Sequence, residues 1–207
     1  MLKIKSFGLI AIVGLLCTGG IFNDAWAAKP PEPTMGADSA AKVLARFADA
    51  VDNGNVADAQ ACLATSTEGA KKFEAFIIKL AQCNGSRKQL LDQIESKFGK
   101  DVRAEAAPLV APSGDMGSYS VLKSASGDDL KDGAKVQIPG FKGAAKLMKS
   151  GDHWIIDPTE VLEGVNQEYL DGEFAHDERL LKACHDAADA AGSAKELIQK
   201  MKDEARK

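Results

Sequence analysis

Apolar residues recur at helical spacing over the first half of the chain, from residue 38 onwards. One stripe contains Val43, Leu44, Phe47, Ala48 and Val51. This spacing predicts an amphipathic helix, which Asp38 or Ser39 would cap and Gly54 would end. A short, alanine-rich helix is expected next, over residues 56–63.

Two further helices are predicted before residue 100. The first would start at a capping box, Thr65-x-x-Glu68, and bury Phe73, Phe76, Ile77 and Leu80. The second would be capped by Ser86 and bury Leu90, Leu91, Ile94 and Phe98. Between them lies Asn84-Gly85-Ser86, which matches a glycosylation sequon and is predicted to be a helix-to-helix loop.

The apolar period shortens after residue 117. Strand-like runs cover 119–123, 134–138, 144–149 and 153–157, and short links rich in Gly, Pro and Asp separate them. Such links require antiparallel pairing. The last hairpin turns at either Ser150-Gly151 or Gly151-Asp152, and the pattern leaves this open. Beyond Pro158, apolar spacing predicts helices over 161–169 and 180–191, and a last one that starts at the capping box Ser193-x-x-Glu196.

Helices followed by a sheet predict an α+β fold, with N-terminal helices packed on a curved antiparallel sheet and extra helices at the C-terminus. Two segments resemble NTF2-like (cystatin-like cone) domains. Residues 47–59 read FADAVDNGNVADA, an apolar helix, a small-residue turn and an alanine-rich helix, and residues 151–157 read GDHWIID, a turn followed by Trp, apolar residues and Asp. The resemblance implies a domain over 38–174 with a helical insert at 68–109, and leaves 175–207 as C-terminal helices. The family's turn usually reads Gly-Asp, whereas this chain has Gly54-Asn55.

Residues 1–27 have the features of an export signal. Lys3 and Lys5 precede an apolar stretch over 7–16, and Ala25-Trp26-Ala27 places small residues where a signal peptidase cuts. A proline-rich linker over 28–37 follows. We therefore expect a mature protein that starts at Ala28 and is periplasmic or secreted. Two alternatives are a lipid anchor on Cys17 and an uncleaved membrane anchor over 7–22.

Composition narrows the classes of partner. The chain has a net charge of −4 and only 6% aromatic residues, which argues against nucleic-acid binding because that function needs a basic surface and stacking platforms. No apolar run after the signal is long enough to span a membrane. Of the cysteines, Cys62, Cys83 and Cys184 lie beyond the signal. We expect buried free thiols, although a bridge from Cys62 or Cys83 to Cys184 stays open.

Few residues offer chemistry. His176, Cys184 and His185 lie among acidic residues, but one helix cannot gather them, so the sequence predicts a solvated acidic face and no metal site or cofactor. Phosphate-binding, zinc-protease and serine-hydrolase motifs are absent. The family resemblance implies a concave site, and Tyr119 and Trp154 are the aromatic residues expected to bind a ligand there.

The predicted function is a non-catalytic binding or interaction module of the cell envelope, which binds a small apolar ligand or a partner protein. Two alternatives remain. One is an isomerase or dehydratase of the NTF2-like kind, for which Tyr119 and Asp157 would supply the acid and the base. The other is a structural protein that interacts through the helices of 175–207. The oligomeric state is not predicted.

Overall fold

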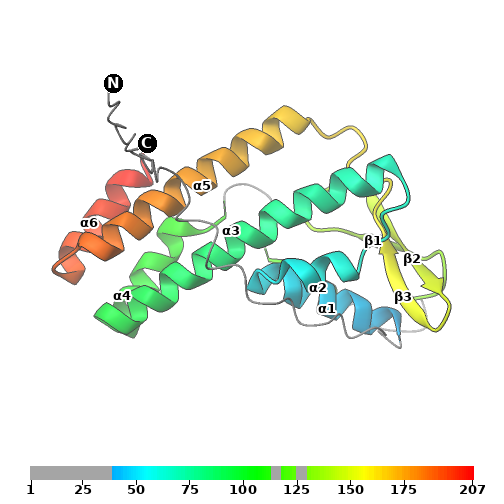
Figure 1. Ribbon diagram of the computed structural model, residues 1–207, viewed down its shortest axis with the longest axis horizontal. Coiled ribbons are helices and arrows are strands. Elements are labelled where there is room, and N and C mark those ends of the chain that lie inside the picture. Colours follow the sequence, from blue (N-terminus) through cyan, green and yellow to red (C-terminus); the bar gives the residue numbers. More distant parts are fainter. Residues whose placement is uncertain (1–38, 113–117, 125–129) are drawn as a thin grey trace, which may run out of the picture. The chain divides into compact units, whose positions relative to one another are not determined.

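The computed structural model describes residues 39–112, 118–124 and 130–207, and all of these residues fall in one compact unit (Figure 1). The predicted signal, the linker over 28–37, Asp38 and Cys17 lie outside the described residues. The predicted α+β class is confirmed, because helices combine with a three-stranded antiparallel sheet.

The two N-terminal helices form as the apolar pattern predicts. Helix α1 spans Ala40–Asn53, and its N-cap is Ser39, whose hydroxyl accepts the Lys42 amide. The predicted stripe of α1 is buried throughout. Gly54 ends the helix with a φ of 77°, a left-handed conformation that glycine adopts at little cost. Asn55 then caps the short helix α2, Val56–Ala61.

Helix α3 is one continuous helix over Glu68–Phe98, so the predicted loop at Asn84-Gly85-Ser86 is wrong. Its N-cap is Thr67, two residues after the predicted Thr65. Gly85 is where the end of α1 meets α3, since a Cβ built on Gly54 would lie 2.4 Å from the Gly85 Cα. The Asn84 side chain donates to the Val51 carbonyl of α1 at 3.0 Å. The segment Asn84-Gly85-Ser86 thus prefers a turn locally, and tertiary contacts stabilise it in a helix.

A second prediction fails at Tyr119. Helix α4 spans Lys100–Ala106, the 3-10 segment η1 spans Ala107–Val110, and residues Tyr119–Ser124 form a second 3-10 segment, η2, in place of the expected strand. The carboxylate of Asp52 in α1 accepts the Tyr119 amide at 2.9 Å and the Ser118 hydroxyl at 2.8 Å. This capping from another element favours a helical turn, and the alternating pattern could not reveal it.

The remaining three predicted strands form a sheet with the order β1-β2-β3. They are β1 (Lys135–Gln137), β2 (Ala144–Ser150) and β3 (His153–Asp157), paired antiparallel as predicted. Ser150 pairs with His153, so Gly151-Asp152 is the hairpin turn. One face of the sheet enters the core, where Leu147 and Ile156 are 0% exposed. Helix α1 contacts β3.

Two helices complete the chain. Helix α5 spans Gln167–Ala190 and α6 spans Ala194–Glu204. Turns occupy most of 158–165, so the helix predicted after Pro158 starts only at Gln167, and the boundary expected between 174 and 175 falls inside α5. The Ser193 cap of α6 is confirmed, since its hydroxyl accepts the Glu196 amide.

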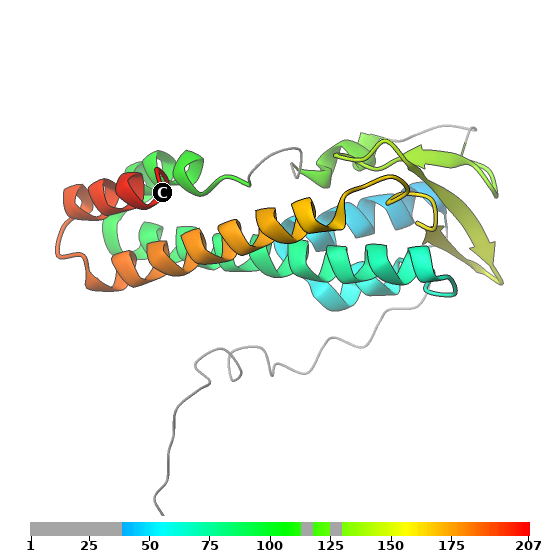
Figure 2. The same ribbon diagram turned by 90° about the horizontal axis from the view of Figure 1, so that it is seen from above.

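Helices α3 and α5 lie side by side (Figure 1, Figure 2). Near their sheet-side ends, Phe141 from the β1–β2 loop packs edge-on against Phe76, with ring centroids 5.0 Å apart. Phe174 of α5 contacts the same Phe76 ring at 5.2 Å. At the other end, α6 contacts both α5 and α4. The two long helices therefore connect the sheet region with the α4–α6 region.

Candidate functional site

Tyr119, the first residue predicted to bind a ligand, lies inside the core. Its side chain is 1% exposed, and its ring meets Phe47 of α1 edge-on at a centroid distance of 5.8 Å. Burial raises the pKa of the Tyr119 phenol far above its usual range, and the negative charge of Asp52 adds to this shift. Tyr119 is thus placed to fill space between η2 and α1.

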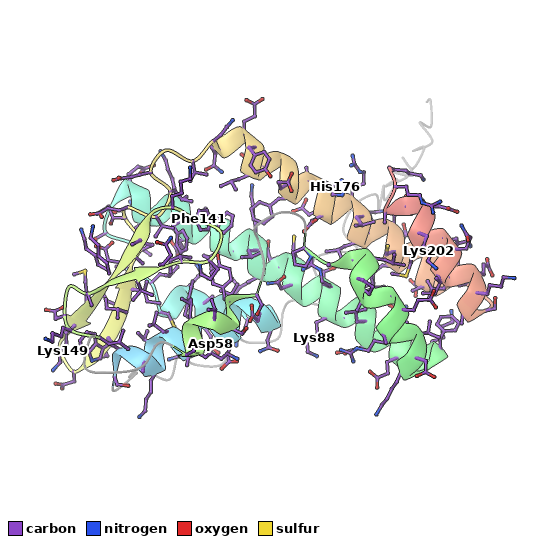
Figure 3. All side chains as sticks on the ribbon, turned by 180° about the vertical axis from the view of Figure 1, so that it is seen from behind. Asp58, Lys88, Phe141, Lys149, His176 and Lys202 are labelled. Carbon is purple, nitrogen blue, oxygen red and sulfur yellow. The ribbon has the colours of Figure 1, made fainter. Side chains whose placement is uncertain are left out.

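Trp154, the second predicted residue, is half-buried on β3. It shares the core-facing side of the strand with Ile156, and its cross-strand partner is Lys149 at the hairpin end of the sheet (Figure 3 labels Lys149). Both η2 and β3 contact α1. Within the described residues, the ring contact of Tyr119 is to Phe47 and none is to Trp154.

Asp157, the carboxylate considered as a catalytic partner of Tyr119, is engaged elsewhere. Its Oδ1 accepts both the amide and the hydroxyl of Thr159, which fixes the turn after β3. The Thr159 hydroxyl also bonds that of Thr67, the N-cap of α3. The carboxylate that does lie beside Tyr119 is Asp52, which binds the backbone amide of that residue. These contacts give both carboxylates roles in fixing turns.

A surface hollow lies between α1 and α2, with a volume of about 460 Å³. Its lining residues are Arg46, Asp49, Ala50, Asn53, Asn55 and Asp58. The Arg46 guanidinium binds Asp58 Oδ1 at 2.5 Å, and the Asn55 amide binds the other oxygen of the same carboxylate (Figure 3 labels Asp58). Lys123 of η2 binds Asp49. The wall is therefore polar and largely self-paired, which suits a polar contact better than an apolar ligand.

Sequence reasoning missed this hollow, although a signal was present. Arg46, Asp49 and Asn53 are spaced i, i+3 and i+7 and so share one face of α1. Asn55 and Asp58 begin the next helix, just after the sharp turn at Gly54. A turn between two helices that carries polar residues on both sides is a place where polar side chains converge.

The three described cysteines are free and buried, as expected. Burial raises the pKa of Cys62, Cys83 and Cys184 to about 11 each. A thiol is nucleophilic only as the thiolate, and a pKa this high leaves little thiolate at neutral pH. Within the described ranges, neither Cys62 nor Cys83 forms a disulfide with Cys184, and all three thiols are free.

The histidines are not gathered around an ion. The His176 Nδ1 lies 3.1 Å from the Arg179 guanidinium (Figure 3 labels His176), whereas the His185 Nε2 lies 3.2 Å from the Ser86 carbonyl and 3.3 Å from the Ser86 hydroxyl. Both contacts join the His185 ring of α5 to Ser86 of α3. Across the described part of the chain, no three His, Cys, Asp or Glu side chains are arranged to hold a metal.

A buried ion pair, which the sequence did not reveal, lies at the middle of α3. Arg87 donates to Asp177 of α5 at 3.1 Å, to Asn84 at 2.6 Å, and to the Val110 carbonyl of η1. Arg87 is 9% and Asp177 3% exposed, so the predicted solvated acidic face is wrong at Asp177. Burial lowers the pKa of Arg87, and the charge of Asp177 opposes that shift. The pair joins α3, α5 and η1.

The outer sheet face is formed by Met148 and Ile155, with Lys146 at its rim. Met148 and Ile155 are cross-strand neighbours that point away from the core, and Met148 is 38% exposed. Lys146 at its rim is paired with Glu160. This face is a small apolar patch with charged neighbours.

The chain matches no known protein family, no curated protein and no solved structure. None of the helices in the described ranges combines the length and the apolarity that crossing a bilayer requires.

Proposed function

We propose that the protein is an exported, non-catalytic module that recognises another protein of the cell envelope through its surface. The observation that carries this proposal is the burial of Tyr119, at 1% exposure and in edge contact with Phe47. Tyr119 was expected to face a small ligand, but its side chain packs inside the core instead. The thiols and the Arg87–Asp177 pair are likewise buried within the fold, which leaves surface side chains to make contacts.

The proposed export rests on the predicted signal over 1–27, and the proposed location is periplasmic or secreted. The NTF2-like relationship is also part of the proposal. Two observations support it: α1 is followed by the short α2 across the turn at Gly54, and Trp154 lies on the β2–β3 hairpin.

A small apolar ligand is the second candidate, and the half-burial of Trp154 favours it. The indole lies on the core-facing side of β3 and retains some exposure. A ligand that covers this ring would remove apolar surface from water, and each Å² removed would stabilise the complex by roughly 25 cal/mol.

The test is native mass spectrometry of the mature protein, purified from the envelope of producing cells with and without lysine-reactive crosslinking. We expect the mass of a chain that starts at Ala28, with no retained small molecule, and a defined crosslinked protein. A chain that keeps residues 1–27 would overturn the proposed export. A mature chain without any crosslinked protein would overturn the proposed partner.

A matched pair of variants separates the two candidates. If an apolar molecule is retained, and Trp154→Ala loses it while Trp154→Phe keeps it, the second candidate replaces the first. Circular dichroism of both variants checks that each is folded. If the crosslinked partner is retained by both variants, recognition occurs away from Trp154.

A further inference from the structure

We draw no further inference here: the strongest candidate, the outer sheet face around Met148 and Ile155, is a small unpartnered apolar face, and nothing in the structure shows what covers it.

Discussion

At the scale of single residues, Gly54 shows most directly how the chain is constrained. Its φ is 77°, and an added Cβ would lie 2.4 Å from the Gly85 Cα. We expect Gly54→Ala to lower the free energy of unfolding by about 3 kcal/mol, from about 1 kcal/mol of backbone strain and roughly 2 kcal/mol of overpacking. Urea unfolding of the purified variant measures this.

Gly133 provides the matched control for this prediction. It has a φ of 80°, but a Cβ there would meet nothing within 4 Å. Gly133→Ala should therefore cost only the backbone strain, about 1 kcal/mol. If the two variants were equally stable, the close approach of α1 to α3 at Gly85 would be wrong.

The buried thiols make a prediction about pH. Burial raises the pKa of the Cys62 thiol from about 9 to about 11 in the folded protein. The folded state thus holds the thiol proton more tightly than the unfolded chain does. The stabilisation that results is fully present below about pH 9 and is lost as the pH rises toward 11. The free energy of unfolding should fall over that range by about 2 kcal/mol for this thiol by pH 10.5.

The comparison with Cys62→Ala isolates this effect. The variant is expected to be less stable at pH 8, and its deficit should shrink by about 2 kcal/mol at pH 10.5 because the unfolded thiolate is gone. Leu63→Ala truncates the neighbouring buried side chain without removing a titratable group, and its deficit should not change with pH. A constant deficit for Cys62→Ala would contradict the raised pKa.

At the scale of elements, the predictions succeed where local pattern and tertiary packing agree. The stripe of α1 and the Ser193 cap of α6 are both confirmed. They fail where a distant element supplies the deciding contact. Asn84-Gly85-Ser86 has turn chemistry, yet Asn84 binds α1 and Arg87 binds α5, and these contacts hold the segment in a helix. Tyr119 has strand spacing, yet Asp52 caps its helical turn.

The Arg87–Asp177 pair is a buried contact between α3 and α5. Removal of one partner leaves the other charge in a buried environment, which typically costs about 3–5 kcal/mol. We expect Arg87→Met to lower the free energy of unfolding by this amount. The double variant Arg87→Met with Asp177→Leu should regain at least half of the loss, because no buried charge remains.

The exposed pair Lys182–Asp186 on α5 is the control. Both side chains are more than 60% exposed, so Lys182→Met should cost no more than about 0.5 kcal/mol. A double-mutant cycle by urea unfolding compares the two pairs. Equal coupling energies in the two cycles would show that the Arg87–Asp177 pair is not desolvated.

At the scale of the whole molecule, the sequence predicts the α+β class and the antiparallel hairpins but not the site. The expected pocket required Tyr119 to lie on a strand. Tyr119 lies instead in a 3-10 turn, which points the Tyr119 ring into the core. The polar hollow forms because α2 folds back closely on α1. The turn at Gly54 sets this arrangement, and the linear pattern of apolar residues does not reveal it. Side chains that converge from different elements are the part of a fold that periodicity cannot reveal.

The two long helices make a prediction about the cooperativity of unfolding. Helix α6 contacts α5, α5 contacts α3, and α3 contacts α1, which in turn contacts β3. Since α3 and α5 are continuous over 31 and 24 residues, loss of packing at α6 should weaken the sheet region through the same transition. Trp154 reports this directly, because the only other tryptophan, Trp26, lies in the predicted signal.

We expect Leu197→Ala in α6 to shift the urea midpoint by the same amount in Trp154 fluorescence and in circular dichroism at 222 nm. Leu197 is 0% exposed, and such a truncation typically costs about 2–5 kcal/mol. Gln199→Ala changes an exposed side chain of the same helix and should leave both midpoints unchanged. If Leu197→Ala moved only the circular dichroism transition, α6 would unfold independently, and the long helices would not carry stability from one end of the unit to the other.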